Sequence, residues 1–196
     1  AALLGFQNKS TCFNGMYRTR LNLEEISLFD WTDGNEFIPA VFFYHLPKFL
    51  LVLGVVTDTQ DTTGVILEEK ETAHLTEEEV RRAILSFVGD YDQVPPMYSA
   101  LKVDGKKLYE LAREGKVVER KARPVQIHEI VIESMNLPEV IMSVSCSKGT
   151  YIRTLCKDIG EALGCGGCMA ALRRVQAGEY TIEEAVPLQE LINAED

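Results

Sequence analysis

Two runs of alternating apolar and polar residues, 125–134 and 140–147, follow each other with only a short gap between them. Alternation with a period of two is typical of strands that bury one face. Asn136 and Pro138 lie in the gap, where these residue types favour a turn. The two runs therefore predict strands in hairpin succession, which is not the strand–helix–strand pattern of a parallel sheet.

A clear helix is predicted over residues 75–90. Thr76 and Glu79 have the spacing of a capping box, and Gly89 supplies a stop signal. The apolar side chains expected to face the core are Val80, Ile84 and Val88.

Shorter elements complete the pattern. Strands are expected at 51–56 and 64–70, and the segment 57–63 between them is rich in Asp and Thr. A short helix is expected between Gly105 and Gly115, another over 169–176, and a last one within 180–192. Strands in succession mixed with helices predict an α+β domain.

The segment 150–163 has apolar residues at helical spacing, and Thr150 is a plausible N-cap. Arg153 then falls in the first turn, where the helix dipole disfavours a cation by about 0.3–1 kcal/mol. Two interpretations stay open from the residues alone. Arg153 is either a solvated side chain or the partner of a carboxylate or phosphate.

Charge is unevenly distributed along the 196 residues. The whole chain carries −10, but residues 98–124 hold eight Lys or Arg and four Asp or Glu, a local charge of +4. The remainder therefore carries −14. A basic segment in an acidic protein is a candidate phosphate-binding surface, and its alternative is a solvated helical face.

Five cysteines without a signal-peptide pattern favour a reducing cytoplasm. Cys165 and Cys168 form one CxxC pair, but no second pair exists, so packed thiols are favoured over a metal site. Prolines and charges interrupt the apolar stretch 37–56, so we predict no membrane span.

Asp58 and Asp61 lie in the Asp- and Thr-rich connection. They are either an acid/base or metal-binding pair, or turn residues whose side chains bond nearby backbone groups. The second interpretation is favoured, because Asp is common in turns for that reason.

Five segments together resemble the TruB family of tRNA pseudouridine synthases, in order from about Leu53 to Leu191. They are LGVVTDTQDTTG, VPPMYSALKVDGKKLYELAREG, RPVQIHEI, CSKGTYIRTLCKDIGEALGCGG and ALRRVQAGEYTIEEAVPLQEL. The resemblance is closer to the bacterial branch than to the dyskerin-like branch.

The resemblance implies a pseudouridine-synthase catalytic domain with a central mixed, largely antiparallel sheet. It implies isomerisation of a flipped-out uridine in the T arm of tRNA, without cofactor or metal. The expected protein is a cytoplasmic monomer whose partner is tRNA, with no role for a membrane.

The resemblance also assigns residues. It makes Arg153 the partner of a catalytic carboxylate, and Tyr151 and Leu172 contacts of the flipped base. It makes the basic segment an RNA-gripping element. The phosphate contacts implied there are Lys102, Lys106, Lys107 and Arg113.

The family's nucleophile, an Asp in a GHTGTLDP-like loop, has no counterpart in residues 1–50. The acids in that region lack its sequence context: Glu24, Glu25, Asp30, Asp33 and Glu36. Residues 1–50 are therefore expected to be an unmatched segment, and joint loss of the upstream motifs favours an out-of-frame or mis-joined origin.

Residues 51–196 are expected to form the catalytic-domain portion, without an additional C-terminal RNA-binding domain. Cys168 stands where the family often has His. The expected function is a pseudouridine synthase impaired by loss of its nucleophile. The alternatives are a non-catalytic tRNA-binding remnant and, more weakly, a metal-binding domain built on the CxxC pair.

Overall fold

The structure is a computed structural model, and it describes residues 45–193 of the 196-residue chain. Ten strands are described: β1 His45–Leu53, β2 Val55–Thr57, β3 Ile66–Glu69, β4 Gly89–Gln93, β5 Lys102–Val103, β6 Lys106–Lys107, β7 Arg123–Asn136, β8 Glu139–Cys146, β9 Gly167–Ala177 and β10 Tyr180–Thr181. The described helices are α1 Glu77–Leu85, α2 Leu108–Arg113, α3 Ile152–Ala162, the 3-10 helix η2 Ile182–Glu184 and α4 Leu188–Asn193.

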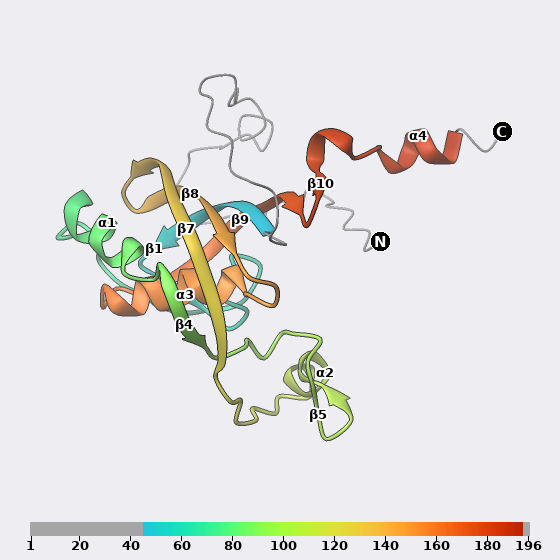
Figure 1. The fold of residues 1–196 in the computed structure, drawn as a ribbon. Helices are drawn as coiled ribbons and strands as arrows, with labels where there is room; N and C mark the ends of the chain where they lie inside the picture. The colour runs from blue at the N-terminus through green and yellow to red at the C-terminus, as the bar shows by residue number, and fades with distance from the viewer. Residues whose placement is uncertain (1–44, 194–196) are drawn as a thin grey trace. The chain divides into compact units, whose positions relative to one another are not determined.

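A six-stranded sheet forms the centre, in the order β10-β9-β1-β8-β7-β4 (Figure 1). Every neighbouring pair in it is antiparallel. The hairpin predicted from alternation is confirmed as β7 and β8. β8 alternates between buried and half-buried residues along its whole length, as a strand with one core-facing side does. The α+β class with a largely antiparallel sheet is therefore confirmed.

One face of the sheet carries the hydrophobic core. β1 contributes Phe49, Leu51 and Leu53, and α3 contributes Leu155 and Ile159, all at most 2% exposed. These residues belong to one cluster that also includes side chains of β8 and α1. α3 packs on β9 and β1, and α1 packs on β7 and α3, so the two helices cover this face.

The capping box predicted for α1 is confirmed. The Thr76 hydroxyl accepts from the Glu79 backbone N–H at 3.3 Å, and the Glu79 carboxylate accepts from the Thr76 backbone N–H at 3.0 Å. The predicted burial of Val88 is wrong. The helix ends at Leu85, so Val88 leaves the helical stripe and is 44% exposed.

The helix predicted over 169–176 is also wrong, because these residues belong to β9. Ala, Leu, Arg, Met and Gln are good helix formers, but that preference is only a fraction of a kcal/mol per residue. β9 instead pairs with β1 from Gly167 opposite Leu53 to Ala177 opposite His45. The backbone hydrogen bonds with β1, which continue on both sides of two register shifts, outweigh the local preference.

Close backbone approach explains the glycines between α3 and β9. A Cβ at Gly160 would collide with the backbone of Gly166 and Gly167. The Gly166 N–H donates to the Gly160 carbonyl at 2.9 Å, so the helix meets the residue just before β9 at hydrogen-bond distance. This contact sets the position of α3 on the sheet.

A small lobe follows β4 and contains β5, β6 and α2 (Figure 1). Asp104 and Gly105 both have positive φ, 51° and 83°, as the two central residues of a type I′ hairpin turn require. The lobe is connected to the rest of the chain by 94–101 and by 114–122, neither of which contains a helix or strand.

None of the helices that the structure describes combines the length and apolarity needed to cross a bilayer. β1 occupies residues 45–53 of the apolar stretch noted in the sequence, and the preceding part lies outside the described residues. β1 also crosses position 50 and is paired with β8 and β9 on both sides.

Candidate functional site

Arg153 lies in the first turn of α3 and faces a carboxylate. Its Nη1 donates to Asp61 Oδ2 at 3.1 Å and to the Thr59 carbonyl at 3.1 Å. Its Nη2 donates to the Tyr98 carbonyl at 2.7 Å. The side chains of Arg153 and Asp61 are 24% and 16% exposed, so the ion pair is largely shielded from solvent. The negative charge of Asp61 offsets the unfavourable interaction between Arg153 and the helix dipole, which was expected from the sequence.

Asp61 also organises its own loop. Its Oδ1 accepts from the Thr63 backbone N–H at 3.0 Å and from the Thr59 hydroxyl at 2.9 Å. The prediction that Asp61 bonds nearby backbone is therefore confirmed, and so is that of Asp58, whose Oδ1 accepts from the Val65 N–H at 2.7 Å. No local pattern indicates that the other Asp61 oxygen pairs with a residue 92 positions away.

The Asp61 loop is tied to β9 and α3 by further bonds. The Met169 N–H donates to the Gln60 carbonyl at 3.1 Å, and the Thr62 N–H donates to the Met169 carbonyl at 3.0 Å. The Thr154 hydroxyl donates to Gln60 Oε1 at 2.8 Å. These bonds fix Asp61 in front of Arg153 before any ligand arrives.

Burial, hydrogen bonds and the neighbouring charge all affect the pKa of Asp61. Burial by itself would raise its pKa, but hydrogen bonds from Thr63 and Thr59 and the charge of Arg153 lower the pKa below its ordinary value. Asp61 is therefore ionised at neutral pH, as an ion-pair partner must be.

Tyr151 is held by a residue that sequence reasoning missed. The structure makes Tyr151, rather than the predicted Thr150, the N-cap of α3, and its side chain makes no capping bond. Gln93, only 1% exposed, accepts from the Tyr151 N–H at 2.7 Å and donates to the Tyr151 carbonyl at 3.1 Å. Thr150 instead donates its hydroxyl to the Ser147 carbonyl. Gln93 has no sequence signature, because its role depends on a contact 58 positions away.

Leu172 lies on β9, three residues beyond Met169, whose backbone holds the Asp61 loop. Its side chain is 47% exposed. The structure therefore brings Arg153 and Tyr151 together at the start of α3 and leaves Leu172 available on the neighbouring strand.

The four predicted phosphate contacts lie on the lobe. Lys107 and Arg113 both stand over the Tyr109 ring, at 5.3 and 5.4 Å from its centroid, and Lys106 pairs with Glu114 at 3.5 Å. Lys102 is exposed on β5 and makes no ion pair with any described residue. The lobe is connected to the site through the segment that carries Tyr98.

The CxxC cysteines are packed thiols. Cys165 and Cys168 are 2% and 0% exposed and carry no disulfide. Burial, and to a lesser degree the charge of Asp61, raises the pKa of Cys168 to about 11. Across residues 45–193, no group of three or more His, Cys, Asp or Glu residues is arranged to hold a metal ion.

Family models match almost the whole described region. The TruB family pseudouridylate synthase N-terminal domain matches residues 48–152, and the tRNA pseudouridylate synthase B C-terminal domain matches residues 153–196. The chain therefore belongs to the TruB family of pseudouridylate synthases, as its motifs predicted.

Among its relatives is the tRNA pseudouridine synthase B of Alkaliphilus oremlandii, 52% identical over 141 residues, which are 72% of this chain and 47% of that protein. The enzyme of the same name from Clostridium perfringens is 52% identical over 142 residues, 72% of this chain and 48% of that protein. The chain thus spans about half the length of the curated relatives it matches.

Solved structures share the fold. A Cbf5–Nop10–Gar1 complex contains a chain that superposes with a TM-score of 0.55 at 24% identity, covering 76% of this chain and 35% of that one. An H/ACA RNP bound to a substrate RNA containing 2′-deoxyuridine gives 0.51 at 20% identity, covering 76% and 33%.

Proposed function

We propose that this chain forms the uridine-binding and RNA-gripping part of a tRNA pseudouridine synthase that acts on the T arm of tRNA. Family membership and the relatives' names support the reaction class. The proposed protein is a monomer working in the cytoplasm, in keeping with the free thiols of its described cysteines.

The pairing of Arg153 with Asp61 is the observation that carries this proposal. A guanidinium fixed by three oxygen acceptors is a preorganised electrostatic element, because it pays no reorganisation when the reaction begins. Arg153 in this role orients a catalytic carboxylate, while Tyr151 and Leu172 contact the uridine once it has left its stack.

Asp61 itself is poorly suited to attack the uridine. One oxygen accepts from Thr59 and Thr63, the other accepts from Arg153, and its pKa is lowered. A carboxylate whose lone pairs are engaged in this way is a weak nucleophile. We therefore assign Asp61 to positioning Arg153 and not to covalent catalysis.

Lys102, Lys106, Lys107 and Arg113 are proposed to contact RNA phosphates. They lie on one small lobe, and such contacts position a nucleic acid without reading its sequence. Affinity for RNA should therefore fall steeply with salt.

A second candidate function is RNA binding without catalysis. Residues 1–50 contain no loop resembling the family's nucleophile loop, and Glu24, Glu25, Asp30, Asp33 and Glu36 lie outside the described residues. Without a nucleophile, the site can bind and orient a uridine but cannot form the covalent intermediate. We expect catalysis by this chain to be strongly impaired.

Tritium release from a T-arm stem-loop labelled at uridine C5 tests these alternatives, with binding followed by fluorescence anisotropy on the same RNA. Binding with little or no release is the expected result and favours the binding function. Rapid release, abolished by Arg153→Lys, would refute the impairment and support the enzyme. Absence of binding at low salt would overturn the proposal altogether.

A further inference from the structure

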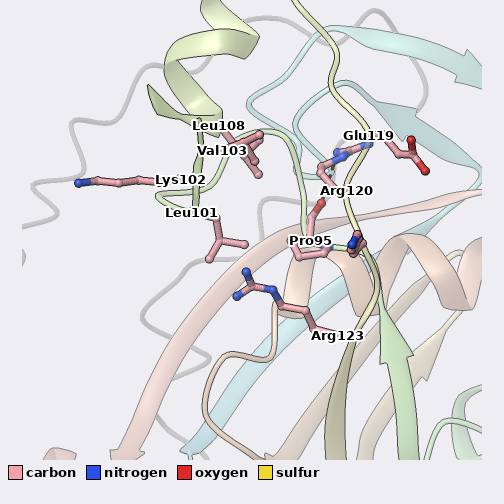
Figure 2. A pocket seen from close by; sticks show the side chains of 9 residues that line it. Pro95, Leu101, Lys102, Val103, Leu108, Glu119, Arg120 and Arg123 are labelled. Atoms are coloured by element: carbon pink, nitrogen blue, oxygen red, sulfur yellow. Dashed lines mark hydrogen bonds between the residues drawn. The ribbon is translucent and has the colours of Figure 1, made fainter. Parts of the chain in front are cut away.

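A pocket of about 270 Å³ lies between the lobe and the segment that leads into β7 (Figure 2). Pro95, Leu101, Val103 and Leu108 supply its apolar lining. Pro95 and Leu108 are buried, the latter 1% exposed, so the walls are part of the packed structure. At this size the pocket suits a fragment smaller than a typical drug-sized ligand.

The charged lining is strongly basic. Lys102, Arg120, Lys121 and Arg123 contribute four positive charges against the single negative charge of Glu119. None of the four cations forms an ion pair with a residue that the structure describes. In Figure 2 the Arg123 guanidinium reaches toward Leu101, whereas the Glu119 carboxylate points away from the apolar side chains.

Arg120 provides a second, independent observation. Its Nη1 donates to the Pro95 carbonyl at 3.3 Å, which fixes the guanidinium against the pocket wall. Its Nε is buried and has no hydrogen-bond partner among residues 45–193. A buried guanidinium donor is unfavourable without an acceptor, so the pocket wall around Arg120 is suited to an anion.

The pocket does not overlap the Arg153 site, but the pairing of β4 with β7 links the two. None of its lining residues contacts Arg153 or Asp61 through a described hydrogen bond. Gln93, which holds the Tyr151 backbone, pairs with Arg123 where β4 meets β7. The β4–β7 pair therefore joins the support of Tyr151 to one wall of the pocket.

We propose that this pocket holds the ribose and phosphate of one RNA nucleotide other than the reacting uridine. The proposal rests on the function proposed above. The cations face the phosphodiester, and the aliphatic walls face the ribose. The aliphatic walls offer no hydrogen-bonding group to a base edge, and the cations are assigned to the phosphodiester. The subsite therefore binds without sequence preference.

Binding of uridine-free oligoadenylate tests the pocket without involving isomerisation. Arg123→Gln should weaken the affinity by about threefold to tenfold and reduce the salt slope by about one. Arg81→Gln is the matched control, since Arg81 is an exposed arginine of α1 outside the lining. It should change affinity less than about twofold. Lys121→Gln, also exposed, provides a second variant and should behave like Arg123→Gln.

Equal losses in the Arg123 and Arg81 variants would overturn the proposal. So would a loss with oligoadenylate but not with oligocytidylate, because the pocket would then read the base. Displacement of the RNA by inorganic phosphate at matched ionic strength would assign the pocket to free phosphate instead. If tritium is released but Arg123→Gln does not weaken RNA binding, the proposed function stands and the pocket proposal fails. If Arg123→Gln weakens RNA binding but no tritium is released, the pocket proposal stands.

Discussion

Arg153 and Asp61 lie 92 positions apart in the sequence, and their side chains meet at 3.1 Å. One comes from the first turn of α3 and the other from the loop between β2 and β3. Because Tyr98 also accepts from Arg153, this single guanidinium joins the sheet-bound helix, the loop and the segment that leads to the lobe.

Asp61→Asn should lower the free energy of unfolding by about 1–3 kcal/mol, because it leaves a largely shielded guanidinium without its counter-charge. Chemical denaturation measures the change. Glu161→Gln is the control, since Glu161 makes an exposed pair with Lys157 on α3 and should contribute less than about 1 kcal/mol. Equal losses in the two variants would contradict a special role for the Arg153 pair.

Low pH should remove the contribution of the Arg153–Asp61 ion pair to the free energy of unfolding. Despite the opposing effect of burial, hydrogen bonds from Thr63 and Thr59 and the charge of Arg153 lower the pKa of Asp61 below 3.8. A carboxyl group with a lower pKa in the folded state stabilises fully only above its unfolded pKa. The contribution should decline as the pH falls past 3.8 and vanish below the folded pKa. Denaturation at several pH values should show a shallower acid slope in Asp61→Asn; identical slopes would refute this.

Gln93→Ala should destabilise the start of α3, because it removes the acceptor of the Tyr151 N–H and one of two donors to the Tyr151 carbonyl, which keeps the Leu155 N–H. We expect a loss of about 2–4 kcal/mol and faster hydrogen exchange at the Tyr151 amide. Gln126→Ala, at an exposed position of β7, is the matched control. Unchanged exchange at Tyr151 in the Gln93 variant would show that Gln93 only fills space.

Gly160→Ala should be destabilising even though Gly160 lies in a helix. Alanine gains up to about 1 kcal/mol in helix propensity over glycine. The added Cβ collides with the Gly166 and Gly167 backbone, and overpacking of this kind typically costs about 1–3 kcal/mol. We therefore expect a net loss in thermal unfolding experiments. Glu161→Ala, on the exposed side of the same helix, should be nearly neutral.

The buried cysteines should resist alkylation in the native state. Burial raises the pKa of Cys156 and, to about 11, that of Cys168, so little thiolate is present at neutral pH. Peptide mapping after iodoacetamide treatment should find both unmodified until denaturant is added. Stoichiometric zinc bound to native protein, or rapid native modification of Cys168, would instead support the metal-binding alternative.

Local patterns predicted the elements that depend on local physics. The capping box of α1 and the alternation of β7 and β8 are properties of a few consecutive residues, and the structure contains all three. The composition of β9 favours a helix, so local patterns predict the wrong element there. Only the presence of β1 beside it decides otherwise.

The candidate site, too, has features that local patterns predict and features that only tertiary contacts determine. A cation in the first turn of α3 left two alternatives for Arg153, a solvated side chain or the partner of an anion, and the family motif favoured the second. Neither identified Asp61 as the carboxylate in this chain, nor Gln93 as the support of Tyr151. Both contacts join segments more than fifty residues apart. Patterns among neighbouring residues of a single sequence cannot predict contacts of this kind.

The central position of β1 has a consequence for synthesis. β1 is the first strand described, yet its two neighbours, β8 and β9, are the eighth and ninth in chain order. A nascent polypeptide must therefore keep this apolar strand without either native neighbour until residues 139–177 have been synthesised. Such late closure slows folding and leaves both edges of an apolar strand unpaired in the meantime.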